Sequence, residues 1–415
     1  MPSLKYFFIN IVGTLLRGFP LPAKTGLRKI GNPDRSSPVF LTCNYAVSVE
    51  RVKKALEGMD CYLLVANSNG INVWCASTGG HLSNHSAVSV LKTSGIEQLV
   101  DHRRVIFPQL AAAGIEAGVV RKKTGWHVIW GPVHAKDIPR FTQILEDGHR
   151  KDANMRMVKF PLLHRLEMAV MWAFPFSLIL ALLTYIFWRQ MLILTVAASW
   201  IVPLFVFITF PLYSGLLTGK KGKNHGFYGN YGSYGSYPGP SKEPHVGRPL
   251  SGKLGISKYT VLFNIGWVSL ILWLVFMLGV LPYSLAAGTL SLSLLLRWGF
   301  VSLSMMLLVN IDLMGSTPVY KSGLHEERLL KVMLDRERCT GCGICVDVCP
   351  RNCFSIEGRK AVITGSERCV QCSACIVQCP EDALYFASPL GKVLMPDTIR
   401  MYKLNMMGSR LKKGA

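Results

Sequence analysis

Acidic residues are scarce in this 415-residue chain, and so is charge altogether. It holds 24 acidic residues against 46 basic ones, a formal net charge of +22, yet only 17% of its residues are charged and 50% are hydrophobic. A disordered basic tail lacks such apolar content, and a soluble globular protein carries more charge. Sparse, mostly positive charge in an apolar chain is typical of an integral membrane protein with basic cytoplasmic edges. The composition therefore favours a membrane protein, and we expect no nucleic-acid partner.

Residues 1–165 contain neither a Gly-x-Gly-x-x-Gly loop nor a Walker loop. The sequence therefore predicts no phosphate-binding loop for a nucleotide in that part of the chain. Cysteine is also scarce outside one short segment, since nine of the 12 cysteines lie between Cys339 and Cys379. Their crowding favours metal ligation in a reducing compartment over disulfide bonds.

A 30-residue repeat accounts for most of these cysteines. Each copy reads Cys-x-x-Cys-x-x-Cys-x-x-x-Cys-Pro, and the copies begin at Cys339 and Cys369. In this pattern three thiolates hold three corners of one cubane, and the fourth ligand comes from the other repeat. We therefore predict two [4Fe–4S] clusters in a ferredoxin-like α+β domain over residues 330–390, in preference to a pair of zinc sites. The predicted ligands are Cys339, Cys342, Cys345 and Cys379 for the first cluster and Cys369, Cys372, Cys375 and Cys349 for the second.

Cys353 lies outside the repeat. We expect a packed thiol there, with a redox or metal-relay role as the alternative.

Residues 37–150 alternate short apolar strands with helical spacing, which predicts one α/β domain. The predicted strands are 38–42, 61–65, 71–74, 105–107 and 127–130, and the predicted helices are 47–56 and 138–145. Ser94 and Glu97 resemble a capping box that opens a further short helix ending at Leu99. In the preceding segment, 1–36, the apolar run between Lys5 and Arg17 is too short to cross a bilayer, so we expect an interfacial amphipathic helix.

Long uncharged runs follow and predict a transmembrane helical domain over residues 160–315. Four helices of spanning length fit, at about 166–187, 191–213, 259–281 and 286–311. Basic residues gather before the first run and in the loop 218–258, whereas only Arg189 separates the first two runs. Under the positive-inside rule both chain ends and that loop face the cytoplasm, which requires an even number of spans. We therefore predict a multi-pass protein of the cytoplasmic membrane with cytoplasmic soluble domains, and four spans rather than five, with Arg297 inside the fourth.

Two further segments carry little predicted structure. Within the loop 218–258, residues 224–241 are rich in glycine, tyrosine and serine, which is typical of a flexible linker. Residues 391–415 form a basic tail.

Cys75 stands where one predicted strand ends and a helix would begin. A helix N-terminus favours the anionic form of a thiol, and a thiolate is a ligand for soft transition metals. From the residues alone, an inert buried cysteine beside Trp74 is the simpler interpretation. His81 and His85 are four residues apart and could share a helix face, either as two surface histidines or as metal ligands.

The segment Asn72-Val73-Trp74-Cys75-Ala76 resembles the signature of HgcA, the corrinoid protein family of microbial mercury methylation. Residues 40–45, 62–71 and 124–132 are similar to the corrinoid-binding domain of the corrinoid iron–sulfur protein large subunit. HgcA joins such a domain to a membrane domain, and its partner HgcB is a two-cluster ferredoxin. The chain resembles the two in that order, as a natural fusion covering about residues 38–387.

This resemblance implies that the α/β domain binds a cobalamin-type corrinoid, with Cys75 as the lower axial ligand of cobalt and the catalytic residue. Thr42, Val73, Trp74 and Ala76 would line the lower corrin face. The thiolate would donate electron density through cobalt to the methyl group opposite, which suits transfer to a soft acceptor such as Hg(II). The clusters would return cobalt to Co(I), which accepts the next methyl group from a separate methyl-donor methyltransferase.

We therefore predict a membrane-bound, corrinoid-dependent methyltransferase. The HgcA signature continues Ala-Gly-Lys, whereas Ser77 and Thr78 follow Ala76 here, and the C-terminal tail has no cysteine, so the acceptor is Hg(II) or another soft species. The expected partners are membrane lipid, the methyl donor, and an electron-donating reductase or ferredoxin. The alternative is a membrane-anchored iron–sulfur electron-transfer protein whose α/β domain only docks a partner.

Overall fold

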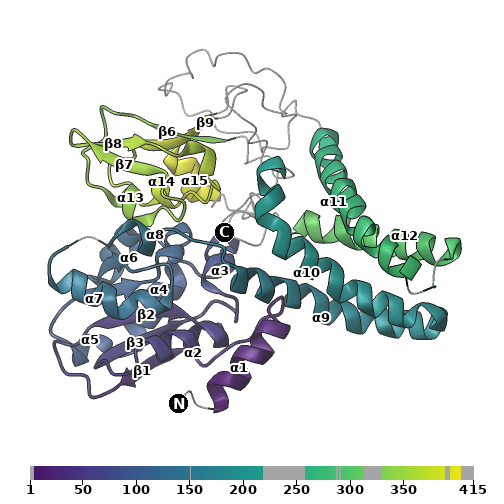
Figure 1. The fold of residues 1–415 in the computed structure, drawn as a ribbon. Coiled ribbons are helices and arrows are strands. Elements are labelled where there is room, and N and C mark those ends of the chain that lie inside the picture. The colour runs from purple at the N-terminus through teal and green to yellow at the C-terminus, as the bar shows by residue number, and fades with distance from the viewer. Residues whose placement is uncertain are drawn as a thin grey trace.

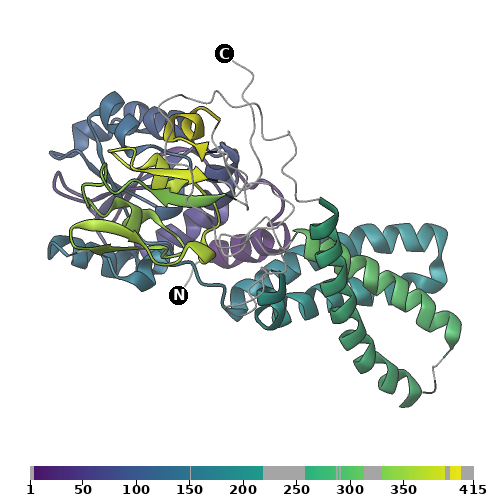
Figure 2. The same cartoon turned by 90° about the horizontal axis from the view of Figure 1, so that it is seen from above.

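The computed structural model describes residues 4–149, 151–217, 258–286, 288, 291–312, 330–387 and 393–402. Three parts are visible in Figure 1: an N-terminal α/β domain, a group of long helices, and a small C-terminal domain seated on the α/β domain. Figure 2 shows the same arrangement from above, with the long helices extending to one side of the two soluble domains. The predicted linker and most of the predicted basic tail lie outside the described residues.

A five-stranded sheet forms the centre of the α/β domain. Its strands are β1 (Gly26–Ile30), β2 (Val39–Cys43), β3 (Cys61–Ala66), β4 (Arg104–Phe107) and β5 (His127–Trp130), and their spatial order is β1-β3-β2-β4-β5. β2 runs parallel to β3 and β4, and β4 runs parallel to β5, whereas β1 is antiparallel to β3. β1 belongs to the segment 1–36 that the sequence assigns to the N-terminal interfacial part, so the sheet begins before residue 37.

Both faces of this sheet are covered, as expected for parallel strands that are apolar throughout. Leu41 and Leu64 belong to one core cluster, while their neighbours Phe40 and Leu63 belong to another, because successive side chains of a strand point to opposite faces. The helices of this domain are α2 (Ala46–Ala55), α3 (Val73–Gly79), α4 (Asn84–Thr93), α5 (Ile96–Leu99), α6 (Ala117–Thr124) and α7 (Ile138–Glu146), with short 3-10 helices η1 (Gln109–Ala113) and η2 (Ala135–Asp137).

Three local predictions in this domain were wrong. Residues 71–74 do not form a strand: Asn72 caps α3, and the apparent alternation of apolar and polar residues comes from that cap. Gly95, in the left-handed region at φ 70°, precedes α5, so no capping box from Ser94 opens it. His81 lies in the turn before α4 while His85 lies inside it, so the two do not share a helix face.

The long helices are α9 (Leu162–Phe187), α10 (Leu192–Leu217), α11 (Lys258–Ala286) and α12 (Leu292–Asp312), which contains Arg297. Within the described residues, 162–187 and 189–214 are long and apolar enough to cross a membrane, and the apolar stretches of α11 and α12 are shorter, at 266–279 and 295–310. The short helices α8 (Ala153–Arg156) and η3 (Arg189–Met191) precede α9 and α10. The N-terminal helix α1 (Leu4–Leu15) contacts both α2 and α9.

The C-terminal domain contains two small antiparallel sheets and short helices. One sheet has the order β10-β9-β6, and the other pairs β7 with β8. The elements are β6 (Lys331–Leu334), α13 (Ile344–Val348), β7 (Phe354–Glu357), β8 (Lys360–Ile363), η5 (Ser366–Arg368), α14 (Ala374–Val377), β9 (Leu384–Ala387), β10 (Val393–Leu394) and α15 (Pro396–Tyr402). Its buried residues Val332, Ile376 and Phe386 belong to the same core cluster as Leu64 of β3, so the two soluble domains share one apolar core.

Candidate cofactor sites

A cavity of about 560 Å³ opens at the carboxyl ends of the parallel strands. β2 pairs with β3 on one side and with β4 on the other, so the chain leaves β2 toward one edge and later crosses to the opposite edge. Such a reversal leaves a crevice at the carboxyl ends of the strands, which is where open α/β sheets bind ligands. The volume is within the range of small-molecule and cofactor sites.

The loop after β3 is held at this edge by Asn44, the residue that follows β2. Its side-chain oxygen accepts hydrogen bonds from the backbone N–H groups of Ser68 and Gly70, at 2.8 and 3.0 Å, and from the Ser68 hydroxyl. Gly70 has a φ of +68°, and a Cβ there would lie 2.6 Å from the backbone nitrogen of Pro22. Glycine is therefore required by both the conformation and the close approach of the two chain segments.

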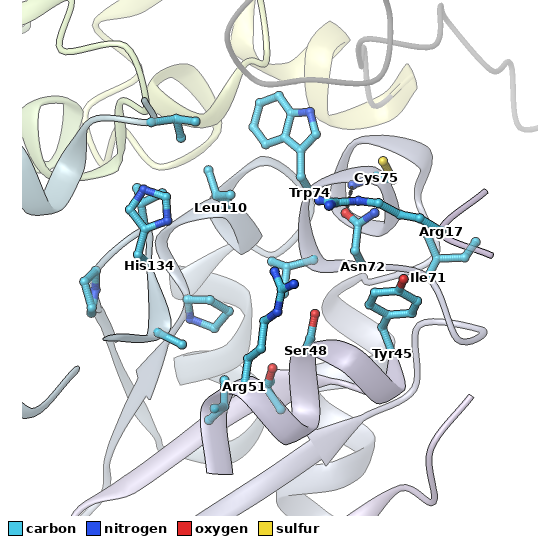
Figure 3. Close-up of a pocket in the computed structure, with 18 of the residues that line it drawn as sticks. Arg17, Tyr45, Ser48, Arg51, Ile71, Asn72, Trp74, Cys75, Leu110 and His134 are labelled. Carbon is cyan, nitrogen blue, oxygen red and sulfur yellow. Dashed lines mark hydrogen bonds between the residues drawn. The ribbon is translucent and has the colours of Figure 1, made fainter. Parts of the chain in front are cut away.

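This loop delivers Cys75 to the rim of the cavity. The Asn72 side chain accepts a hydrogen bond from the Cys75 N–H at 3.0 Å and so fixes the first turn of α3. Cys75 is half-buried, whereas the other two cysteines of this domain, Cys43 and Cys61, are buried. Burial raises the pKa of the Cys43 thiol and raises that of Cys61 to about 12. Figure 3 shows the Cys75 sulfur next to Trp74 and Arg17, with His134 on the opposite side of the cavity.

Of the residues predicted to contact a corrinoid, Thr42, Val73, Trp74 and Cys75 line the cavity. Ala76 is fully buried in the apolar core and is not part of the lining. The four lining residues come from the end of β2 and the start of α3, so the fold brings together residues more than 30 positions apart in the sequence.

The long helix α9 supplies another wall of the cavity, through His164, Met168 and Met171, together with Phe160 just before it. Its Glu167 accepts hydrogen bonds from Arg17 at 2.6 Å and from Arg51 of α2 at 2.8 Å. Glu167 is 13% exposed and the two arginine side chains are 31% and 36% exposed, so the three charges meet in a partly buried network. This network fixes the start of α9 against the α/β domain.

His134, in the loop after β5, faces the α9 wall. Its ring centroid lies 5.7 Å from that of His164, and both rings line the cavity. Burial, assisted by the neighbouring His164 ring, lowers the pKa of His134 and favours its neutral form.

The cysteine repeat forms a second candidate site in the C-terminal domain. A small hollow there is lined together by the four thiols predicted for the first cluster, Cys339, Cys342, Cys345 and Cys379. Gly341, at φ +74°, lies where a Cβ would approach the Arg359 carbonyl far too closely, so the ligand loop can fold only with glycine at this position. No three described His, Cys, Asp or Glu side chains converge on one point suited to a single metal ion. The thiols of a cubane each bind a different iron, so the cluster prediction does not require them to converge.

The four thiols predicted for the second cluster are also neighbours. Burial and the nearby Cys349, Cys369 and Cys372 raise the pKa of Cys375 well above its usual range. Backbone N–H groups donate to four of the eight predicted ligand sulfurs, a contact that tunes the potential of iron–sulfur clusters. The donors and acceptors are Ala361 to Cys339, Cys353 to Cys349, Gln371 to Cys369 and Ala383 to Cys379, at 3.3–3.4 Å.

Gln378, which precedes the ligand Cys379, joins the two soluble domains. Its side-chain nitrogen donates to the carbonyls of Ala112 and Ile115, at 2.8 and 2.6 Å, and its side-chain oxygen accepts from the Ala117 N–H at 3.1 Å. A further interdomain bond runs from the Val158 N–H to the Pro350 carbonyl at 2.9 Å. Every polar atom of the buried Gln378 amide is therefore bonded to the α/β domain.

The 3-10 helix η1 lies between the two candidate sites. It contacts α3, which carries Cys75, and it also contacts α13 and α14, which carry Cys345 and Cys375. Leu110 of η1 lines the cavity. The geometry therefore places the predicted cluster ligands directly behind one wall of the cavity.

A buried lysine stabilises the same junction. Lys151 donates to the side-chain oxygen of Gln109 and to the carbonyls of Trp130 and Gly131, at 2.7–2.9 Å. Burial lowers the pKa of Lys151 to about 7, and Asp347 of α13 opposes that shift. The charge state of this side chain is thus set partly by the C-terminal domain.

Comparison with known proteins identifies the same two soluble parts. Residues 17–142 match the family described as CO dehydrogenase/acetyl-CoA synthase delta subunit. The N-terminal domain is therefore similar to the members of that family. Residues 332–355 and 366–383 each match a model described as a 4Fe-4S binding domain. Two matches to 4Fe-4S binding domains therefore follow the delta-subunit-like domain in one chain.

The N-terminal domain also resembles curated proteins named acetyl-CoA decarbonylase/synthase complex subunit gamma. The one from Methanopyrus kandleri is 34% identical over 126 residues, which cover 30% of this chain and 27% of the relative. The Methanocaldococcus jannaschii protein is 34% identical over 124 residues, covering 29% and 25%. The chain spans about a quarter of the length of these relatives. The matches agree with the predicted resemblance to corrinoid iron–sulfur proteins.

Several lining residues were not predicted from the sequence. Arg17, Arg51, His134 and the α9 residues reach the cavity only through tertiary contacts, such as the one that joins Arg17 to Glu167 across 150 positions. The one feature of the sequence that pointed to these contacts was Glu167, an acidic residue near the start of an apolar helix. Such a residue implies a buried cationic partner without saying which one.

Proposed function

We propose that this protein is a membrane-bound, corrinoid-dependent methyl-transfer protein whose C-terminal ferredoxin domain reduces the corrinoid. The observation that carries the proposal is the position of η1, which contacts the helix of Cys75 and the helices of two predicted cluster ligands. A redox centre on one side of η1 and a cofactor cavity on the other need no separate docking step for electron transfer.

The lining of the cavity offers donors that suit a corrinoid. Its wall is mainly apolar, with Cys75 at the rim as a soft sulfur donor and Trp74 beside it. When bound, a corrinoid supplies a cobalt centre that carries a methyl group between a donor and an acceptor. Arg17 and Arg51, held by Glu167, line the α1–α2 side of the cavity, and α9 forms a further wall.

The eight repeat cysteines fit two [4Fe–4S] clusters. Their spacing, the backbone N–H groups that donate to their sulfurs and the 4Fe-4S family matches support this assignment. Cluster potentials down to about −400 mV or below suit the reduction of cobalt. Electrons would enter from a reductase or another ferredoxin.

The proposed location is the cytoplasmic membrane, with four spanning helices. Exposed apolar side chains on α9 support lipid contact, because Leu178, Leu182 and Ile186 are 58–61% exposed. The methyl group would come from a separate methyltransferase, and the acceptor would be Hg(II) or another soft species.

Corrinoid binding by Cys75 is tested by anaerobic reconstitution of the full-length protein. We expect a cobalt–corrinoid absorbance spectrum that shifts in Cys75→Ala and stays unchanged in the control Cys61→Ala, a fully buried thiol outside the cavity. Absence of bound corrinoid in the wild-type protein would contradict the proposal. If Cys75→Ala leaves cluster reduction and electron transfer to a partner protein unchanged and no corrinoid binds, the α/β domain only docks that partner.

A further inference from the structure

We propose that His134, His164, Met168 and Met171 form a binding site for a soft metal cation on the α9 wall of the cavity. The inference rests on the proposed function and deepens it, because it names the class of species that would accept the methyl group. It is drawn from side chains that neither the family matches nor the cysteine repeat includes.

Three of the four donors lie on one face of α9. His164, Met168 and Met171 are spaced by four and then three residues, which places them one above another along a helix. All three line the cavity. The face that α9 turns toward the α/β domain therefore presents one imidazole and two thioethers to the cavity.

The fourth donor faces this helix from the α/β domain. The His134 and His164 ring centroids are 5.7 Å apart, with an angle of 48° between the ring planes. Because metal–imidazole bonds are about 2.0–2.1 Å long, rings at this separation can each donate one lone pair to a single ion between them. The ion would join α9 to the loop after β5.

The chemistry of the lining selects a soft cation over a hard one. Imidazole and thioether groups prefer metals such as Cu(I), Ag(I) and Hg(II), whereas Ca²⁺ and Mg²⁺ require several oxygen ligands. Among the described residues, no lining side chain of this cavity is a carboxylate. Arg17, Arg51 and Lys159 also line it, and their positive charge further disfavours cations that bind mainly through charge.

The position of the site relates it to Cys75. In Figure 3, His134 and Cys75 lie on opposite sides of the view, with Leu110 and Trp74 between them, and all four residues line the same cavity. A ligand that fills the cavity would therefore contact Cys75 on one side and the soft-metal site on the other. A methyl carrier and an acceptor held in this way would be brought together in one cavity.

The test uses Cu(I) as the probe, because it favours thioether and imidazole ligands. Full-length protein with reconstituted clusters and the background substitution Cys75→Ser is titrated anaerobically, without corrinoid, against a chromophoric Cu(I) chelator. We expect one Cu(I) per chain, with nitrogen and thioether sulfur neighbours in X-ray absorption. The double substitution Met168→Leu/Met171→Leu should weaken binding about tenfold or more, as should His134→Phe.

Two control variants separate ligation from packing. Met305→Leu/Met306→Leu changes two methionines buried in the core of the long helices, and His127→Phe changes an exposed histidine of β5. Met→Leu keeps side-chain volume nearly constant, so folding should survive in both methionine variants, as the cluster absorbance will verify. Equal Cu(I) affinity in all variants, thiolate-only coordination or no binding at all would overturn the proposal.

Corrinoid binding is measured separately in the same four variants with Cys75 restored. Cu(I) binding that fails while corrinoid still binds would overturn the soft-metal site alone. Wild-type protein that takes up no corrinoid would overturn the proposed function, whatever the Cu(I) result.

Discussion

Arg51 of α2 donates a hydrogen bond to Glu167 of α9 at 2.8 Å, and this contact connects the α/β domain to a helix long and apolar enough to cross a membrane. Glu167→Gln removes the charge shared by Arg51 and Arg17 while keeping the shape of the side chain. Because the network is only partly buried, we expect a loss of about 1–3 kcal/mol in unfolding free energy. Thermal unfolding in detergent, followed by tryptophan fluorescence, measures the change.

Asp101→Asn is the matched control for this prediction. It breaks an ion pair with Arg35 in which both side chains are 66% exposed, and such solvent-screened pairs contribute little to stability. Equal effects of the two substitutions would show that Glu167 does not fix α9 against the α/β domain.

Gln378→Leu should separate the two soluble domains functionally. The substitution removes three interdomain hydrogen bonds and leaves the Ala112 and Ile115 carbonyls and the Ala117 N–H unpaired, at a cost of about 1 kcal/mol or more each. We expect slower reduction of bound corrinoid by reduced clusters, measured by anaerobic stopped-flow absorbance, with an unchanged cluster spectrum. The exposed Gln143 of α7 offers a control, since Gln143→Leu should alter neither stability nor rate. An unchanged rate in Gln378→Leu would mean that electrons reach the cavity without this contact.

Cys353 and Cys349 should behave differently although a hydrogen bond joins them. The Cys353 N–H donates to the Cys349 sulfur at 3.3 Å, but only Cys349 belongs to the repeat. Cys349→Ala should lower the iron content from about eight to about four per chain, whereas Cys353→Ala should retain both clusters. Iron analysis and low-temperature electron paramagnetic resonance provide the measurement. Loss of a cluster in Cys353→Ala would contradict the prediction, because it would mean that Cys353 is a cluster ligand.

Lys151 predicts a pH dependence of stability. Because its pKa is about 7 in the folded chain and its ordinary value is 10.5, the unfolded chain holds the extra proton between those two pH values. The free energy of unfolding should therefore rise with pH from about 7 toward 10.5, by at most about 1.4 kcal/mol per pH unit from this group. Lys151→Met should flatten that rise, which thermal midpoints at pH 7 and 8.5 would reveal. The same pH slope in both proteins would contradict the prediction.

The sequence predicted the features that depend on residues close together in the chain. The cysteine repeat, the strands β2 to β5 and the helices α2, α7, α9 and α10 all follow from local spacing. The strand predicted at 71–74 failed because an apolar–polar alternation four residues long also fits a capping residue such as Asn72. β1 was missed because its charged residues Arg28 and Lys29 interrupt the apolar pattern of this edge strand.

The walls of the cavity could be predicted only in part. Thr42 and Cys75 were accessible through the resemblance of their surrounding motifs, but Arg51, His134 and Met168 carry no local pattern that marks them as neighbours. Their meeting depends on how α9 packs against the carboxyl ends of the strands, and that packing is a property of the whole fold.

The position of α9 has consequences for fragments of this chain and for the influence of the membrane on the cavity. The segment that matches the delta-subunit family ends at residue 142, before Phe160 and His164, so a fragment cut at that boundary would lack one wall of the cavity. If α9 spans the bilayer, its depth and tilt determine which part of the helix forms the wall of the cavity. Bilayer thickness would then affect the reaction in the cavity. A helix displaced along its axis by one turn, about 5.4 Å, would place different side chains against the bound ligand.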